Sequence, residues 1–180
     1  MALTRLLLLY VFATEVLDAE TRPIDFVCDR ESRRGINTVV AMEAALADCY
    51  ALSTLPFPVQ LPCIKVHKAS WDNKSHQEKQ GDIMASLGAL AEGVRSVRLV
   101  RILPGCASSL LERLEHSINN YLHILTHLEQ VSMVSPVLSC VPQSSQSMKT
   151  VLWTYSRLIT GKLEWLMSDL IDRCPPLGQK

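Results

Sequence analysis

The sequence predicts an all-α domain in which four long helices form an up-up-down-down bundle with two long crossover loops. Three observations lead to this fold class. Four segments repeat apolar residues at helical spacing, the connections between them run long, short and long, and six cysteines lie near the expected helix ends and in the long connections. The 180-residue chain is 48% apolar and only 6% aromatic, which suits one helical domain with a buried core.

The N-terminal segment predicts secretion. Residues 1–19 place Arg5 before a short apolar run, Leu6 to Ala13, and small residues follow. This is the layout of a signal peptide, and the run is too short to cross a bilayer as a helix. We expect cleavage after Ala19, no membrane insertion, and one soluble, monomeric four-helix domain over residues 20–180. The formal net charge is zero, so no global field attracts nucleic acid.

The first two helical segments are expected at about residues 29–47 and 70–101. In each, apolar residues recur every three or four positions, so one face of the helix should be buried. Gly35 weakens the first pattern. The expected stripe of the first segment is Ile36, Val40, Ala44 and Ala47, widened by Val39, Met42 and Leu46. That of the second is Ile83, Leu87, Leu90, Val94 and Val97.

The third and fourth segments are expected at about residues 107–131 and 147–172. Gly161 interrupts the fourth pattern, and a glycine in an exposed helix costs roughly 1 kcal/mol relative to alanine. We therefore expect the bare backbone there to serve something other than helix stability. The third stripe is Leu111, Leu114, Ile118, Tyr121, Leu125 and Leu128. The fourth is Leu152, Tyr155, Ile159, Leu163, Leu166 and Leu170.

The connections decide the order of the helices. Prolines and an extended run, "FPVQLPCIKV", occupy the first connection, and "QVSMVSPVLSCVPQSS" forms the last. Between them only "ILPGC" separates the second and third helices, which makes those two antiparallel neighbours. A long connection can run the length of a helix and start the next one at the same end. The order long, short, long therefore predicts the up-up-down-down arrangement.

Six cysteines in a secreted chain indicate three disulfides, although six cysteines allow 15 connectivities. In the predicted bundle, Cys28 before the first helix and Cys174 after the last would share an end. Cys49 and Cys106, at the end of the first helix and the start of the third, would share the other. Cys63 and Cys140 lie in the two crossovers and are paired by elimination.

Four stretches carry a resemblance to a known family. They are "VQLPCIKVHKASW", "QGDIMASLGALAEGV", "LPGCASSLLERL" and "LITGKLEWLM", and in order and spacing they resemble the erythropoietin/thrombopoietin family of long-chain helical cytokines. The resemblance reaches from Cys28 to Cys174. It implies a secreted hormone that brings together two chains of a class I cytokine receptor, whose associated Janus-family kinases then start phosphorylation inside the cell.

Within that family the thrombopoietin branch is favoured, which implies the thrombopoietin receptor as partner and growth of the megakaryocyte or thrombocyte lineage. "DIMASLGALAEGV" resembles that branch's second helix, and Cys106 stands directly before "ASSLLERL". The alternative is an erythropoietin-like hormone for erythroid cells. A bridge from Cys49 to Cys106 would support the first reading, and a local bridge from Cys49 to Cys63 the second.

The resemblance also implies receptor-binding residues on two faces. A high-affinity face would combine the last helix, the first crossover and part of the first helix, and a weaker face would use the basic flank of the first helix. Thr160 and Glu164 stand where the family carries basic residues, and Arg157 could partly replace them. The residues expected on the high-affinity face are Lys162, Gly161, Arg157, Lys79 and Asp29, and those on the weaker face are Arg30, Arg33 and Arg34.

Two further motifs concern modification and metal. Asn73 begins the only N-glycosylation acceptor, Asn73-Lys74-Ser75, which we expect to be used in a secreted chain. His123 and His127 are four residues apart, a spacing that can chelate zinc, but no third ligand is evident. We expect no metal and no cofactor.

Enzyme motifs are missing from the sequence, including G-x-S-x-G, phosphate loops and dinucleotide-binding glycines, so we expect no enzymatic activity. Two alternatives from other classes stay open at this point. A helical lipid carrier would show an apolar cavity, and a zinc hydrolase would hold metal. Trp71, Trp153 and Trp165 are expected to anchor helices, and Trp165 could also be an exposed anchor for a partner.

Overall fold

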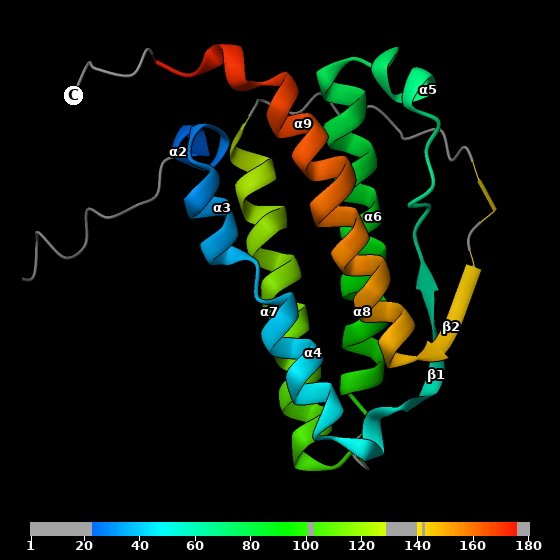
Figure 1. Ribbon diagram of the computed structural model, residues 1–180. Helices are drawn as coiled ribbons and strands as arrows, with labels where there is room; N and C mark the ends of the chain where they lie inside the picture. The colour runs from blue at the N-terminus through cyan, green and yellow to red at the C-terminus, as the bar shows by residue number, and fades with distance from the viewer. Residues whose placement is uncertain (1–22, 101–102, 129–139, 142, 176–180) are drawn as a thin grey trace, which may run out of the picture.

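The computed structural model describes residues 23–100, 103–128, 140–141 and 143–175. The expected signal peptide, residues 1–19, lies outside the described residues. Figure 1 shows the first two helical stretches running downward and the last two running upward, with β1 (Thr54–Leu61) and β2 (Gln143–Ser147) beside the bundle. The predicted up-up-down-down order and the mainly helical fold class are confirmed.

The first helical stretch is broken into α2 (Pro23–Cys28), α3 (Arg30–Ile36) and α4 (Val39–Ala47). The prediction of one helix over residues 29–47 is therefore wrong at its centre. Asn37 has extended backbone angles (φ −76°, ψ 100°), and its side-chain oxygen accepts a hydrogen bond from the Val39 amide at 3.1 Å. An asparagine side chain that bonds nearby backbone competes with helix continuation at this position.

The break also changes which side of α4 faces the core. Val39 and Met42 are buried, whereas Val40 is 79% exposed and Ala44 and Ala47 face solvent. The apolar stripe expected from Ile36 through Ala47 required one continuous helix. That prediction is wrong because two non-helical residues separate α3 from α4, so the residues of α4 point in other directions than a continuous helix would give them.

The second stretch is also two helices, the short α5 (Lys68–Asp72) and the long α6 (His76–Arg98). A continuous helix over residues 70–101 is thus wrong at its start, where Ser75 is extended and caps α6. The Ser75 hydroxyl accepts from the Glu78 amide at 3.2 Å, and the Glu78 carboxylate accepts from the Ser75 amide at 2.7 Å. This reciprocal capping box fixes the first turn of α6 and lets α5 take its own direction.

The third stretch is the single helix α7 (Gly105–Leu128), and residues 129–131 of the prediction lie outside the described residues. The fourth is continuous from α8 (Met148–Arg157) through a π-helical segment, η2 (Leu158–Leu163), to α9 (Glu164–Asp169) and a 3₁₀ turn, η3 (Ile171–Arg173). Gly161 lies inside η2. The apolar stripes expected for the second, third and fourth helices are buried, except that Leu128 is half-buried.

The two crossovers meet in a two-stranded antiparallel ribbon. A 3₁₀ turn, η1 (Tyr50–Leu52), leads into β1 (Thr54–Leu61), which pairs with β2 (Gln143–Ser147). β1 includes the start of the expected extended run, whereas β2 has a sequence, "QSSQS", without an apolar alternation to indicate a strand. β1 packs closely against α6 at Gly93, because a β-carbon there would lie 2.8 Å from the side chain of the buried Val59.

Three disulfides close the fold. Cys28 is joined to Cys174, Cys49 to Cys106, and Cys63 to Cys140, with Cα–Cα distances of 5.6, 5.9 and 6.1 Å. The first two are the pairs that the predicted helix order suggested, and the third is the pair that was left by elimination. The first bridge joins the N-terminal helix α2 to the segment that follows the last helix. The second links the end of the first helical stretch to the start of α7, and the third links the two crossovers.

Candidate functional site

The start of α6, the short helix α5 and the end of the last helix meet around one buried tryptophan. Trp71, on α5, is 1% exposed, and three lysine ammonium groups lie near its ring. The nitrogens of Lys74, Lys79 and Lys162 are 5.7, 5.8 and 5.8 Å from the ring centroid. Cations at this range are attracted to the negative face of an indole ring, so the ring and the three lysines hold α5 against α6 and η2.

Two aspartates neutralise part of this charge. Asp82 lies 3.0 Å from the Lys162 nitrogen and 3.5 Å from that of Lys74, and Asp169 lies 2.7 Å from that of Lys79. Lys162 and Lys79 are only 3% and 4% exposed. Both lysines expected on the receptor face are therefore brought together, but their ammonium groups point into contacts within the chain. Asp82, Asp169 and Lys74 were not singled out from the sequence, since helical spacing alone does not show which helices are neighbours.

A second tryptophan covers the outer side of this cluster. The ring of Trp165 lies 6.1 Å from that of Trp71, and the Lys68 nitrogen is 5.6 Å from the Trp165 centroid. Trp165 is 38% exposed, and the side chain of Lys68 is 73% exposed. Trp165 and Lys68 therefore present an aromatic ring and an ammonium group to solvent, whereas Trp71, Lys79 and Lys162 are buried.

Gly161 lies one residue before the buried Lys162, in the π-helical segment. A β-carbon built on it meets nothing within 4 Å, so packing within the described chain does not require a glycine. Arg157 and Thr160 are exposed on the preceding turn, and the Thr160 hydroxyl donates to the Ser156 carbonyl at 2.7 Å. The surface here offers accessible backbone and a cation.

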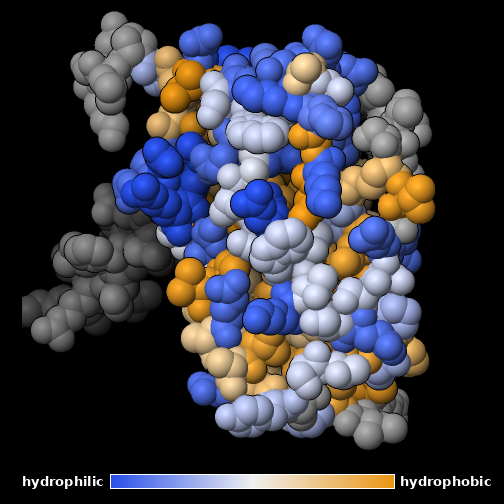
Figure 2. Space-filling model, turned by 45° about the vertical axis from the view of Figure 1, so that its right-hand side comes forward, coloured by the Kyte–Doolittle hydropathy of each residue, from blue (hydrophilic) through white to orange (hydrophobic). Residues whose placement is uncertain are grey.

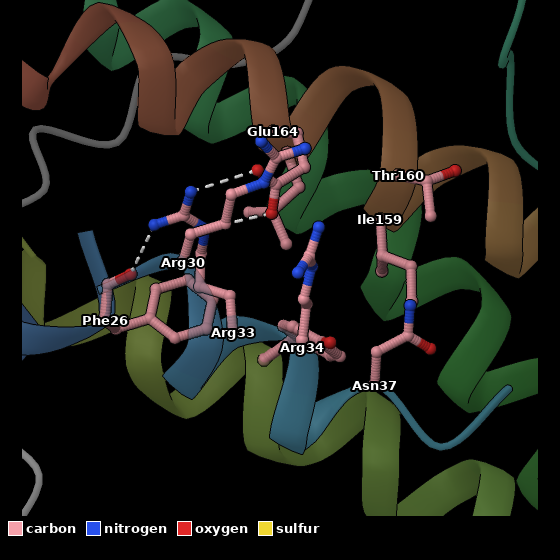
Figure 3. Close-up of a pocket in the computed structure, with 10 residues that line it drawn as sticks. Phe26, Arg30, Arg33, Arg34, Asn37, Ile159, Thr160 and Glu164 are labelled. Carbon is pink, nitrogen blue, oxygen red and sulfur yellow. Dashed lines mark hydrogen bonds and ion pairs between the residues drawn. The ribbon is translucent and has the colours of Figure 1, made fainter. Parts of the chain in front are cut away.

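Figure 3 shows a hollow between α3 and the last helix, with a volume of about 200 Å³. Arg33 forms one wall. Its guanidinium donates to both carboxylate oxygens of Glu164, at 2.9 and 3.1 Å, and to the carbonyls of Phe26 and Val27, at 3.0 and 2.7 Å. Glu164 is therefore the ion-pair partner of Arg33.

The other charged residues predicted on α3 are at the surface. Arg34 pairs with Glu31 at 2.7 Å, and Arg30 is exposed at the rim of the hollow. Asp29 caps α3, accepting from the amides of Glu31 and Ser32 at 2.9 and 3.3 Å. The hydrogen bond from the Ser32 hydroxyl, together with these amides, holds the pKa of Asp29 below its ordinary value.

Figure 2 shows how the surface divides along the bundle. Hydrophilic residues gather at the end where α5, the start of α6 and α9 lie, while weakly polar and apolar residues are more frequent toward the opposite end. Among the described residues, no three histidine, cysteine or acidic side chains are placed to hold a metal ion. None of the described helices is long and apolar enough to span a membrane.

Comparison of the chain with known proteins identifies its family. A family model described as erythropoietin/thrombopoietin matches residues 26–175, most of the chain. The chain belongs to the erythropoietin/thrombopoietin family. A search of curated proteins found no match.

Members of the erythropoietin/thrombopoietin family are cytokine hormones that bind class I cytokine receptors, so this protein is a hormone and not an enzyme. The zinc-hydrolase and lipid-carrier alternatives are set aside on this ground. Secretion of the family fits an extracellular location.

Proposed function

We propose that this hormone acts through the thrombopoietin receptor, bringing two receptor chains together and promoting growth and maturation of the megakaryocyte or thrombocyte lineage. The observation that carries this proposal is the bridge from Cys49 to Cys106. It ties the end of the first helical stretch to the start of α7, which is the pairing that resembles the thrombopoietin branch. A local bridge between Cys49 and Cys63 would have favoured the erythropoietin branch, and here Cys63 is bonded to Cys140.

The proposed high-affinity face lies where α5 and the last helix adjoin. Trp165 and Lys68 supply an exposed aromatic ring with a cation above it, and interfaces favour such anchors. Gly161 and Arg157 extend the face along the last helix, where an uncovered backbone allows close approach. Asp29 belongs to the same end of the bundle, near the bridge that joins Cys28 to the last helix.

In this proposal Lys162 and Lys79 act by positioning. Each ammonium pairs with an aspartate and lies over Trp71, so each orients α5 and, through the ring of Trp71, the exposed ring of Trp165. Replacing either lysine would weaken receptor binding through loss of this arrangement rather than through loss of a direct contact.

The second, weaker face is proposed on α3. Arg30 and Arg34 are exposed there, and Arg33 fixes the helix to Glu164. Exposed charges at the rim of an interface set the association rate more than the affinity. A hormone held at the cell surface by one receptor chain on its first face would meet a second receptor chain at high effective concentration, so a weak contact at the second face suffices.

Reporter cells that carry either the thrombopoietin receptor or the erythropoietin receptor of the matching species test the proposal. The purified hormone should signal only through the first. Trp165→Ala and Lys68→Glu should shift the dose–response by roughly tenfold or more, as expected for an anchor residue. Trp153→Ala is the matched control, because Trp153 is 51% exposed on α8, away from α5. A response only through the erythropoietin receptor would move the hormone to the other branch.

Processing of the chain is part of the proposal. Residues 1–19 would be removed on secretion, and Asn73 would carry an N-glycan. Asn73 is exposed at the end of α5, where a glycan projects into solvent without disturbing the core. Mass spectrometry of the secreted protein should give Glu20 as the first residue and a mass loss on enzymatic deglycosylation, and Asn73→Gln should abolish that loss.

A further inference from the structure

The exposed face of α7 carries a pair of histidines that lies outside both proposed receptor faces. His123 and His127 stand one helical turn apart, and both are exposed. Their ring centroids are 4.3 Å apart, with the ring planes inclined by 50°. Residues at this spacing lie on the same side of a helix, so the two imidazoles face the same volume of solvent.

The hydrogen bond of His127 determines which of its nitrogens is available. Its Nδ1 lies 2.8 Å from the backbone carbonyl oxygen of His123. A carbonyl oxygen can only accept, so Nδ1 must carry the proton and donate. In the neutral ring, Nε2 then has a free lone pair. This arrangement is the usual one for a histidine that binds metal, because the second hydrogen bond fixes both the tautomer and the orientation of the ring.

His127 is in the last described turn of α7. The helix is anchored by a buried face that includes Leu125 and Tyr121, so the two histidines are presented from a fixed backbone rather than from a loop.

We propose that His123 and His127 form a two-ligand, solvent-open site for a borderline divalent metal ion such as Zn²⁺ or Cu²⁺. Two nitrogens on one tetrahedral zinc ion lie roughly 3.4 Å apart, given Zn–N bonds of about 2.0–2.1 Å. The two ring centroids are 4.3 Å apart, so turning the His123 ring alone would bring the two nitrogens to that separation while the His127 ring keeps its hydrogen bond to the His123 carbonyl. No third histidine, cysteine or acidic ligand is at hand in the described part of the chain, so the remaining positions on the metal are left to water.

The sequence shows no third ligand for this pair. Spacing alone cannot show whether a ring nitrogen is held as a free acceptor. The tertiary structure supplies that information through the bond between the His127 ring and the His123 carbonyl. Chelation by two ligands on one side of a helix binds a metal more tightly than either ligand alone, because the second bond forms at high effective concentration.

Calorimetric titration of the purified secreted hormone with ZnCl₂ tests the site. The parent protein should bind Zn²⁺ at one dominant site, and His123→Asn and His127→Asn should each weaken that binding by roughly tenfold or more. His116→Asn is the matched control, because His116 is exposed on the same helix but two turns away from His123. It should bind as the parent does. Zn²⁺ should also raise the Tm of the parent and the control, but not of the other two variants.

A second measurement does not depend on the variants. In NMR spectra of the parent protein, substoichiometric Cu²⁺ should broaden backbone signals near His123 and His127 before all others. The proposal is overturned if the parent shows no saturable Zn²⁺ binding, if the two variants bind as tightly as the parent, or if Cu²⁺ broadens signals elsewhere first.

Discussion

Replacing Asp82 by asparagine should reveal the cost of burying the ammonium group of Lys162. That group lies 3.0 Å from Asp82, and the Lys162 side chain is 4% exposed. Removing one partner of a buried ion pair costs about 3–5 kcal/mol, because the other charge stays buried without a counterion. The Trp71 ring at 5.8 Å and the 17% exposure of the Asp82 side chain reduce this cost. We expect a loss of about 3 kcal/mol in the free energy of unfolding.

Lys162→Met should cost less than Asp82→Asn. Methionine replaces most of the volume of the lysine stem, and Asp82 keeps Lys74 at 3.5 Å. We expect a loss of about 1 kcal/mol. The double variant Asp82→Asn/Lys162→Met should be more stable than Asp82→Asn alone, because no unpaired buried charge remains. This recovery distinguishes an unpaired charge from a simple loss of contacts.

Urea unfolding at neutral pH with the disulfides intact, followed by circular dichroism, gives these free energies. In thermal melts, a loss of about 3 kcal/mol corresponds to a fall in Tm of roughly 6–12 °C for a domain of this size. Glu31→Gln is the control, because Glu31 and Arg34 form an exposed pair, with side chains 76% and 62% exposed, and should change stability by under about 0.5 kcal/mol. Equal losses for Asp82→Asn and Lys162→Met, or a double variant at the sum of the two, would refute the reasoning.

Three further perturbations test the scaffold. Gly93→Ala should destabilise the protein by about 1–3 kcal/mol in urea unfolding, because the new methyl group meets Val59, and Val59→Ala should restore much of that loss. Ser75→Ala should cost about 1 kcal/mol through loss of the α6 cap, compared by the same method in unglycosylated protein, whereas Ser75→Thr should cost less. The hydrogen bond from Arg95 is the main interaction that holds the pKa of Glu115 below its ordinary value. A lowered folded pKa gives stability that is present above the unfolded pKa and lost as pH falls through the folded one, so Glu115→Gln should destabilise at neutral pH and be nearly neutral in acid. An equal loss at both pH values would contradict this assignment.

Much of the fold was predictable because it depends on local patterns. The apolar stripes of α6, α7 and the last helix alternate by three and four residues, and those positions are the buried ones. The lengths of the connections gave the order of the helices, since a short link forces neighbours to be antiparallel. Cysteines placed relative to helix ends then suggested the bridges, such as that from Cys28 to Cys174.

Local patterns were misleading where a single polar side chain ends a helix. Asn37 and Ser75 bond to nearby backbone and break helices that the apolar pattern alone would have continued. The break at Asn37 turned α4, so that Val40 faces solvent instead of the core. Hydrophobic periodicity does not report such competition between side-chain and backbone hydrogen bonds.

The sequence by itself determined the helices, their order and the family resemblance of the chain. Only the tertiary structure decided what the charged residues do. Lys162 pairs with Asp82, 80 residues away, and Arg33 with Glu164, 131 residues away. Helical periodicity specifies which face of a helix is buried, but not which polar group of another helix lies opposite. That depends on the lateral arrangement of the helices, and it is why the two lysines expected at the surface are instead buried beside Trp71.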